Sequence, residues 1–323
     1  MELYPLKFNP VYSYRIWGGN KLRTVLNKDY NQENIGESWE VSDVEHNETR
    51  VSEGQLKGKS LKDLINQFKG DFVGDNVYET FGINFPLLIK FIDAKTPLSI
   101  QVHPSNELAK ERHNSFGKNE MWYVLQAEEN AELIVGFSGT VEKENYIEHL
   151  NKSTLSEILN IEKVSSGDTF YIPTGRVHAI GAGVLLAEIQ QTSNITYRIY
   201  DYDRIDSKTG EKRELHTSLA IDAIDFDYYE NYRTDYAKKI NTSNKLVHSP
   251  YFKTNIIHVS KAMEMDYSKT DSFVIYMCVE GKLEVEFDNK NYSLQMGETL
   301  VIPAVIKELT LIGAKAKLLE IYM

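Results

Sequence analysis

Four polar residues between positions 101 and 178 have the types and spacing of a metal site. Gln101 and His103 belong to PLSIQVHPS, where polar and apolar residues alternate as on a β-strand. Glu120 opens the apolar run EMWYVLQ, and His178 follows a Pro-x-Gly turn in GDTFYIPTGRVH. Two imidazoles, a carboxylate and an amide oxygen suit Zn²⁺ or another divalent metal that accepts nitrogen and oxygen ligands.

The alternation in this first segment predicts one apolar and one polar strand face. The polar face carries Ser99, Gln101 and His103. Such a face either contacts water or lines a polar cavity whose contents offset the cost of desolvation. Because a lone histidine is more often a hydrogen-bonded structural residue than a ligand, the metal hypothesis depends on the elements that position these residues.

Short β-branched or aromatic runs separated by Gly, Asn and Asp turns dominate the chain. Examples are FPLLIKFID, EMWYVLQ, AELIVGF, GVLLAEIQQ, FKTNIIHVS, FVIYMCVEG, KLEVEF and AKLLEIYM. They predict a mainly β protein, built as a sandwich or barrel. A few peripheral helices are expected at 60–70, 141–150 and 154–160, the last with Thr154 and Glu157 as a capping box.

An internal repeat indicates that the chain contains the same β unit twice. GDTFYIPTGRVH (167–178) and GETLVIPAVIKE (297–308) share a Gly, an acidic residue, a Thr, three apolar positions and a Pro at identical spacing. Glu308 takes the place of His178, so the second copy is expected to bind no metal. We predict a catalytic unit over 1–235 with helical decorations and a degenerate unit over 236–323.

The composition excludes several partners. A net charge of −11, without a cluster of Lys and Arg, argues against nucleic acid. The N-terminal residues lack the basic head and apolar core of a secretory signal, and no window reaches the apolar length of a membrane span. We therefore expect a cytoplasmic protein without a membrane partner. Cys278, the single cysteine, lies in an apolar run and predicts a buried thiol.

The motifs resemble a known family. Gly167, Pro173, Gly175 and His178 have the spacing G-x5-P-x-G-x2-H of the second half of the cupin signature, and Q-x-H followed by a Glu resembles its first half. PLSIQVHPS, KNEMWYVL, GDTFYIPTGRVHAI and NITYRIYDY, with YRIWGG and GESWEVS, resemble type I mannose-6-phosphate isomerase in its short bacterial form. The resemblance implies two cupin-type jelly-roll barrels or sandwiches. It also implies an aldose–ketose isomerase that interconverts mannose 6-phosphate and fructose 6-phosphate through a cis-enediol.

The same resemblance implies roles for individual residues. One Zn²⁺ per chain would be bound by Gln101, His103, Glu120 and His178. Arg198 would stabilise the negative charge that develops on the substrate. Glu188 is the candidate base, with a metal-bound water as the alternative. Ser99 and Lys118 match positions near the substrate phosphate. Arg204 is the candidate to replace a lysine, because this chain reads RIYDYDR where longer members read R-x-G-L-T-P-K.

Two other functions remain open at this point. A metal-dependent cupin oxygenase would use the same fold, but it commonly carries His-x-His where this chain carries Gln101-x-His103. A non-catalytic sugar-phosphate sensor would keep the pocket without turnover. Loss of Arg198 or Glu120 would favour a sensor, and both residues are present.

Overall fold

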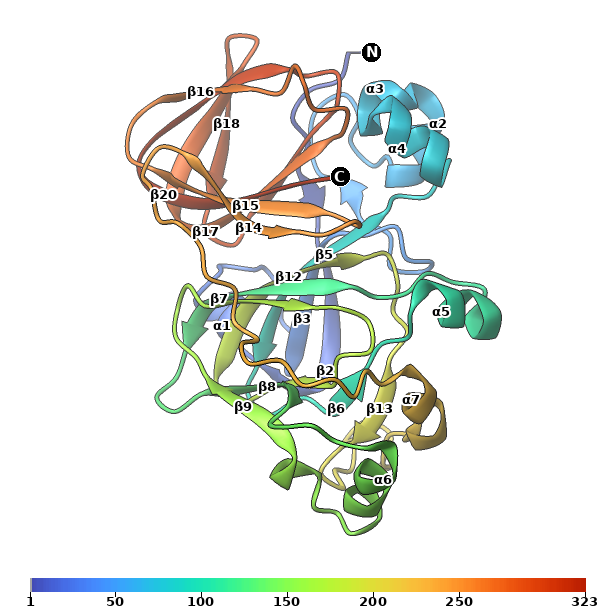
Figure 1. The fold of residues 1–323 in the computed structure, drawn as a ribbon. Helices are drawn as coiled ribbons and strands as arrows, with labels where there is room; N and C mark the ends of the chain where they lie inside the picture. Colours follow the sequence, from blue (N-terminus) through green and yellow to red (C-terminus); the bar gives the residue numbers. More distant parts are fainter. Residues whose placement is uncertain (1) are drawn as a thin grey trace.

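Antiparallel β-sheets form most of the regular structure of this protein (Figure 1). The structure is a computed structural model that describes residues 2–323. Two large sheets belong to the N-terminal part of the chain and a third large sheet to the C-terminal part. The sheets form sandwiches, which confirms the predicted mainly β fold. Within the described residues, no helix is both long and apolar enough to span a membrane.

The first sheet has six strands in the order β10-β7-β12-β5-β2-β3. Its strands are β2 (Val11–Gly19), β3 (Ile35–Val41), β5 (Leu87–Ala94), β7 (Glu120–Ala127), β10 (Thr169–Ile172) and β12 (Val184–Gln191). β3, β5 and β12 are buried at every position because both faces of this sheet are covered. This explains why the sequence of β5 is an almost continuous apolar run.

The second sheet has five strands in the order β13-β6-β11-β8-β9. Its strands are β6 (Ile100–Val102), β8 (Glu132–Phe137), β9 (Leu159–Lys163), β11 (His178–Ile180) and β13 (Tyr197–Tyr200). Side chains of both N-terminal sheets meet in one cluster, where Ile92 and Trp122 of the first sheet pack with Leu133 and Ile180 of the second. The two N-terminal sheets therefore form a sandwich around this core, and the residues assigned to the metal lie on or next to its strands.

The C-terminal sheet follows the order β14-β15-β20-β17-β18, with β16 paired to β20 and β19 paired to β17. Its strands are β14 (Ser243–His248), β15 (Lys253–Val259), β16 (Met263–Asp266), β17 (Val274–Phe287), β18 (Lys290–Gln295), β19 (Thr299–Ile302) and β20 (Glu308–Tyr322). It encloses its own apolar cluster, which includes the buried Cys278 thiol. A further cluster joins Phe91 and Met121 of the six-stranded sheet to Ile275 and Leu319 of this one.

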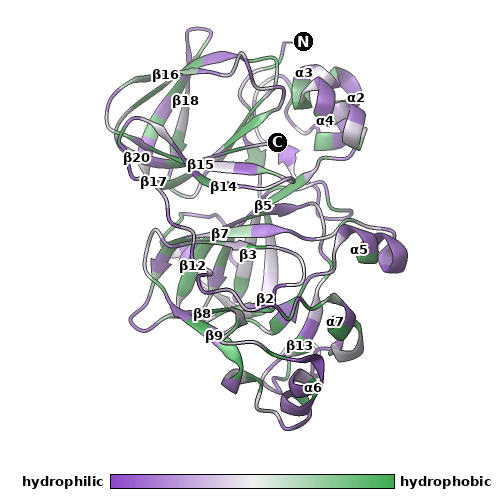
Figure 2. Ribbon diagram, in the orientation of Figure 1, coloured by the Kyte–Doolittle hydropathy of each residue, from purple (hydrophilic) through white to green (hydrophobic). Residues whose placement is uncertain are grey.

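Short helices and a two-stranded sheet decorate the sandwiches. The helices are α1 (Lys21–Thr24), α2 (Leu61–Phe68), α3 (Gly70–Val73), α4 (Asp75–Phe81), α5 (Asn106–His113), α6 (Lys143–Asn151) and α7 (Thr217–Ala223), and the small sheet pairs β1 (Phe8–Asn9) with β4 (Arg50–Val51). Ser60 caps α2, and Asp63 completes a capping box. Figure 2 shows that α5 is mainly hydrophilic, in keeping with its peripheral position.

Two local predictions are wrong. Residues 154–160 form only a 3₁₀ turn, η1 (Leu155–Glu157), without a side-chain cap from Thr154. The chain enters β9 at Leu159, which pairs with Phe137, so sheet pairing prevails over the amphipathic pattern. FVIYMCVEG and KLEVEF, expected as separate strands, form the single strand β17, because both halves pair with the long strand β20. Gly281, with a positive φ of 73°, lies within this ladder.

Candidate active site

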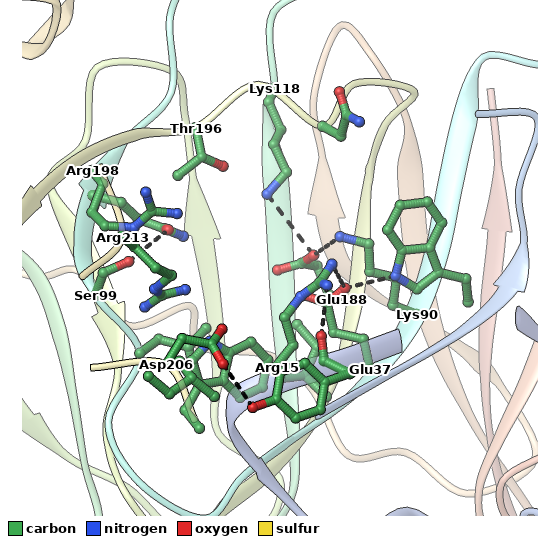
Figure 3. A pocket seen from close by; sticks show the side chains of 18 residues that line it. Arg15, Glu37, Lys90, Ser99, Lys118, Glu188, Thr196, Arg198, Asp206 and Arg213 are labelled. Carbon is green, nitrogen blue, oxygen red and sulfur yellow. Dashed lines mark hydrogen bonds and ion pairs between the residues drawn. The ribbon is translucent and has the colours of Figure 1, made fainter. Parts of the chain in front are cut away.

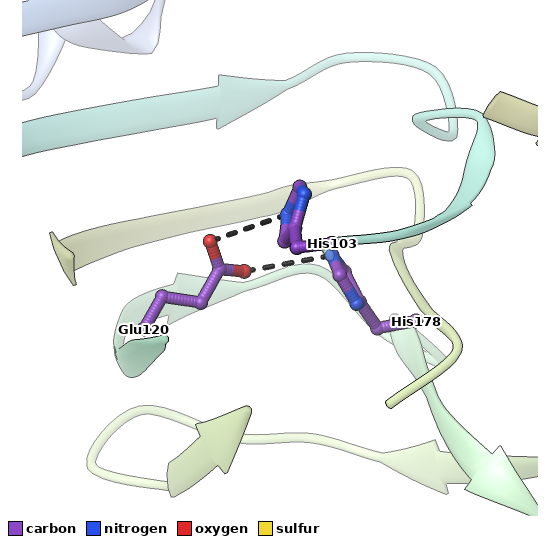
Figure 4. Close-up of side chains that lie close together, drawn as sticks. All are labelled: His103, Glu120 and His178. Atoms are coloured by element: carbon purple, nitrogen blue, oxygen red, sulfur yellow. Dashed lines mark ion pairs between the residues drawn. The ribbon is translucent and has the colours of Figure 1, made fainter. Parts of the chain in front are cut away.

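Three buried side chains with donor atoms converge from the two N-terminal sheets (Figure 4). Glu120 is the first residue of β7 and His178 the first of β11, whereas His103 directly follows β6. Their donor atoms all lie within 4.8 Å of one another. The structure thus brings together three of the four residues that the sequence analysis assigned to a metal.

The Glu120 carboxylate lies between the two imidazoles. Its Oε2 is 3.5 Å from His103 Nε2, and its Oε1 is 3.5 Å from His178 Nε2. The fourth predicted ligand, Gln101, lies opposite His178 in the β6–β11 ladder, with its amide nitrogen 3.2 Å from His178 Nε2. A half-turn of this amide places its oxygen at the cluster instead, because the two ends of an amide occupy nearly the same volume.

The second nitrogen of each imidazole is anchored to the backbone. His103 Nδ1 lies 2.9 Å from the carbonyl oxygen of Ile195, and His178 Nδ1 lies 2.8 Å from that of Arg176. A carbonyl only accepts, so each Nδ1 donates its hydrogen and each Nε2 keeps a lone pair directed at Glu120. Burial lowers the pKa of both histidines, that of His103 to about 3, so both rings are neutral near pH 7. Metal-binding histidines typically have this arrangement.

A cation already contacts these donor atoms. The Lys118 ammonium donates to Glu120 Oε2 at 2.6 Å and lies 3.0 Å from His103 Nε2. Burial alone raises the pKa of Glu120, but the Lys118 ammonium brings it well below its usual value. Glu120 Oε1 has no hydrogen-bond partner within residues 2–323. A buried anionic oxygen without a donor, beside two imidazole lone pairs, fits a divalent metal.

A cavity of about 390 Å³ adjoins the cluster (Figure 3). This volume is within the range of small-molecule sites. Its charged lining consists of Arg15, Glu37, Lys90, Lys118, Glu188, Arg198, Asp206 and Arg213, and its apolar lining includes Trp17 and Trp39. Both tryptophans are also buried core residues. A cavity with this excess of cations suits an anionic ligand.

Two residues of one cavity wall, Lys90 and Glu188, belong to a row of three residues across the six-stranded sheet. Glu188 of β12 is flanked by Lys90 of β5 and Trp122 of β7. Lys90 Nζ lies 3.0 Å from Glu188 Oε1, and Trp122 Nε1 donates to Oε2 at 3.1 Å. Lys118 Nζ is 3.9 Å from the same carboxylate. These contacts fix the orientation of Glu188 at the cavity.

Glu37 forms a second anchored carboxylate beside this wall. Arg15 Nη2 and Trp39 Nε1 both donate to Glu37 Oε2, at 2.8 and 2.7 Å. Burial by itself raises the pKa of Glu37, but Arg15 and Lys90 lower it to about 2. Arg15 and Lys90 are thereby partly neutralised by protein carboxylates.

Arg198 lies in the opposite wall, on the side of Ser99 and Arg213 (Figure 3). It pairs with Gln101 in the β13–β6 ladder, so Arg198, Gln101 and His178 form a row across three strands. Its Nη1 donates to the carbonyl oxygen of Glu214, whereas Nε has no partner and no carboxylate of residues 2–323 lies within 4 Å of the guanidinium. Burial, and then Arg213, lower the pKa of Arg198. This guanidinium is the cavity cation that protein anions neutralise least.

Of the remaining predicted site residues, some line the cavity and one does not. Ser99, Lys118 and Glu188 line the cavity, but Arg204 does not. The Arg204 guanidinium instead contacts Asp201 and the carbonyl oxygen of Pro97. The chain turns at Tyr202 and Asp203, both at positive φ, and this turn directs Arg204 away from the cavity.

Several cavity residues were not singled out from the sequence. Arg213 donates twice to Asp201, at 2.8 and 2.6 Å, and lines the cavity where Arg204 was expected. Lys90 was detectable, because it is the only charged side chain in the run FPLLIKF. Glu37 and Trp39 alternate in GESWEVS and so share a strand face. No sequence signal distinguishes Arg213 from its exposed neighbours.

The fold and the cluster together define a cupin-type protein with a candidate metal centre. Residues 5–140 match the family described as phosphomannose isomerase type I, catalytic domain, and residues 242–323 match the mannose-6-phosphate isomerase cupin domain. The chain therefore combines a catalytic-domain match and a cupin-domain match in one polypeptide.

Individual relatives agree over nearly the full length. The mannose-6-phosphate isomerase of Streptococcus mutans is 34% identical over 308 residues, which cover 94% of this chain and 93% of the relative. Mannose-6-phosphate isomerase ManA of Bacillus subtilis is 33% identical over 319 residues, covering 97% of each. The crystal structure of the mannose 6-phosphate isomerase from Bacillus subtilis superposes with a TM-score of 0.91 at 31% identity, covering 99% of this chain and 100% of the other. The chain belongs to the type I mannose-6-phosphate isomerase family and is an isomerase.

Proposed function

We propose that this protein interconverts mannose 6-phosphate and fructose 6-phosphate through a cis-enediol, with one Zn²⁺ per chain. The observation that carries the proposal is the cluster of His103, Glu120 and His178 beside a cation-lined cavity, in a chain of this family. Gln101 is the fourth proposed ligand, because its amide reaches His178. When bound, the metal supplies a positive charge that polarises the sugar carbonyl.

Proton transfer is assigned to Glu188. Isomerisation moves the hydrogen on C2 of the aldose to C1, and the proton on O2 to O1. A carboxylate at the cavity wall suits removal of the C2 proton and its return to C1. Lys90 and Trp122 hold Glu188 in one orientation, so little reorganisation accompanies the transfer.

Stabilisation of developing charge is assigned to Arg198. The enediol forms with partial negative charge on the sugar oxygens, and a guanidinium stays protonated while it donates to them. Arg198 lies in the wall opposite Glu188 and lacks a carboxylate partner within the described residues. A sugar between the two walls contacts both groups.

The substrate phosphate is assigned to the Arg198 side of the cavity, with Ser99 and Arg213 as ligands (Figure 3). Lys118 was the other candidate, but its ammonium lies 2.6 Å from Glu120 and 3.9 Å from Glu188. A phosphate there would meet two carboxylates, and like charges at such distances repel. The geometry therefore supports Arg213 rather than Lys118 or Arg204 for this role.

We further propose that the two units of the chain have different roles. Residues 1–235 would form the catalytic unit and residues 236–323 a unit without a metal site. The contacts of the junction support this boundary, because Ile240 pairs with His258 and the Asn241 amide donates to the His258 carbonyl. Residue 240 thus already packs with C-terminal strands.

Metal analysis combined with a coupled assay tests the function. We expect about one zinc per purified chain and turnover of mannose 6-phosphate that chelation abolishes and Zn²⁺ restores. Bound metal should also raise thermal stability, since its ligands come from separate strands. Full turnover by a protein shown to be metal-free would refute the metal's role.

A further inference from the structure

Arg176 is a buried arginine whose charge has no acidic partner. Its residue is 7% exposed, its Nε has no hydrogen-bond partner, and no carboxylate of residues 2–323 lies within 4 Å of its guanidinium. Burial of an unpaired charge is costly, so another interaction must compensate. None of the roles proposed above uses this side chain.

Two tyrosines provide that compensation. The Arg176 guanidinium carbon lies 4.2 Å from the ring centroid of Tyr229 and 4.8 Å from that of Tyr232. Aromatic faces attract a guanidinium, most strongly where water is excluded. The Tyr232 hydroxyl also donates to the Phe137 carbonyl and accepts from the Phe137 amide, so β8 fixes this ring.

The arginine belongs to the turn that carries His178. The Arg176 carbonyl accepts the Nδ1 hydrogen of His178 at 2.8 Å. In the same turn, the Gly175 amide donates to the His103 carbonyl, and the Gly175 carbonyl accepts from the Asp225 amide. The turn thus contacts both histidines of the cluster on one side and residues after α7 on the other.

The tyrosines lie on the segment that connects α7 to the C-terminal sheet. In Figure 1 this segment crosses the front of the N-terminal sandwich before it reaches β14. Two contacts fasten it there, since Phe170 pairs with Arg233 and the Thr234 amide donates to the Thr169 carbonyl. The two tyrosines that contact Arg176 therefore belong to a segment that is held on the sandwich by contacts of its own.

We propose that Arg176, packed against the two rings of Tyr229 and Tyr232, positions His178 and thereby sets the affinity of the metal centre. The guanidinium fixes the turn, the turn fixes the carbonyl oxygen of residue 176, and that oxygen keeps the Nε2 lone pair of His178 directed at Glu120. Such an acceptor for the second nitrogen orients a metal-binding histidine and contributes to its affinity. This inference rests on the proposed role of His178 as a ligand.

The test uses the full-length protein, stripped of metal by chelation and titrated with Zn²⁺ against a chelating dye. Tyr229 is 40% exposed, so its replacement leaves the apolar core intact. We expect Tyr229→Leu to weaken Zn²⁺ binding by about 10- to 100-fold. Tyr229→Phe, which keeps the aromatic face, should bind as tightly as the parent, and Tyr228→Leu is the matched control at an exposed neighbour.

A cobalt-substituted protein supplies a readout that folding alone does not change. The visible absorption of Co²⁺ should shift in Tyr229→Leu but not in Tyr229→Phe, at unchanged melting temperature of the metal-free proteins. If Tyr229→Leu does not fold, Arg176→Lys carries the same test, since lysine keeps the charge and loses the planar guanidinium that packs against the two rings.

Two failures are distinguishable. A parent protein that binds no Zn²⁺ overturns the proposed function itself. If the parent binds Zn²⁺, and Tyr229→Leu or Arg176→Lys has equal affinity and an unchanged cobalt spectrum, only the positioning role of Arg176 and its two tyrosines is overturned.

Discussion

The two β units of this chain place different residues at matching points of the same strand register. In the N-terminal unit Glu120 lies opposite Ile172 of the GDTFYIP segment. In the C-terminal unit Val274 lies opposite Ile302 of the GETLVIP segment. The position of the metal-cluster carboxylate is therefore occupied by a valine in the second copy.

The histidine position differs in the same way. His178 lies opposite Gln101 in the first unit, whereas Glu308 lies opposite Asp266 in the second. Two carboxylates without an imidazole replace a histidine and an amide. The two units thus share a backbone register but not a metal site. The register sets where a side chain lies, and the type of side chain decides whether it can bind a metal.

The row of residues around Glu188 also has a counterpart in the second unit, with a glutamate at the same position. Across three strands the first unit reads Lys90, Glu188 and Trp122, and the second reads Asn255, Glu320 and Tyr276. Glu188 lines the cavity. Glu320 instead accepts from Tyr267 at 2.6 Å, from Asn255 at 2.9 Å and from Ser243. Both carboxylates accept from the protein's own donors, but only Glu188 also faces a cavity.

The largest expected effect comes from giving the first unit the residue of the second. Glu120→Val should remove the anionic oxygen between the imidazoles, so the metal should no longer bind. The transition state would then lose the metal's stabilisation of its charge, which is worth several kcal/mol. We expect kcat/KM to fall about 10³-fold or more, with loss of bound zinc. His113→Ala, on the exposed helix α5, is the control and should retain both. A zinc-loaded, active Glu120→Val protein would contradict the assignment.

Glu188 and Glu320 occupy matching positions in the two units, so replacing each in turn compares the units directly. Glu188→Gln should lower kcat by about 10²- to 10⁴-fold, as expected for loss of a general base, without loss of zinc. Glu320→Gln should leave kcat unchanged but lower the free energy of unfolding by about 1–3 kcal/mol, because its buried donors lose acceptors. Denaturant unfolding and the coupled assay measure both variants. If Glu320→Gln also lost turnover, the asymmetry between the units would be wrong.

Arg198 and Arg213 sharpen the comparison within the catalytic unit. If Arg198 meets charge that grows in the transition state, Arg198→Ala should lower kcat by about 10²-fold with little change in KM. Arg213→Ala should mainly raise KM, because a phosphate that does not react is held equally in both states. Steady-state kinetics at equal zinc content separates the two. The reverse pattern would make Arg198 the phosphate ligand.

The last prediction concerns the acid stability of the catalytic unit. The pKa of Glu37 falls from 4.5 to about 2 on folding. Because the folded value is the lower one, this stabilisation, of the order of 3 kcal/mol, is complete above about pH 4.5 and is lost as the pH falls toward 2. Glu37→Gln should therefore lose less stability over this range. Tryptophan fluorescence is a suitable probe, since Trp17, Trp39 and Trp122 all lie in the first unit; parallel loss in both proteins would contradict the expectation.

The sequence was sufficient for the fold class and for the cluster. Alternation in PLSIQVHPS, the apolar start of β7 and the Pro-x-Gly turn each act over a few residues, so the strand faces of Gln101, Glu120 and His178 follow from local pattern. The repeat also located the counterpart of His178 at Glu308. The helix expected at 154–160 failed for the opposite reason, because pairing of β9 with the distant β8 decided its conformation.

By itself, then, the sequence determined which residue types stand at which strand positions. Only the tertiary structure decided which of them share a cavity. Arg15, Glu37, Lys90 and Arg213 come from segments far apart in the chain, and Arg204 and Arg213 are equivalent in sequence until a turn at positive φ directs one away. Likewise, Glu188 and Glu320 occupy matching register positions, but only Glu188 lines a cavity, whereas Glu320 accepts from Tyr267. Contacts between distant segments set these outcomes, and no local pattern encodes them.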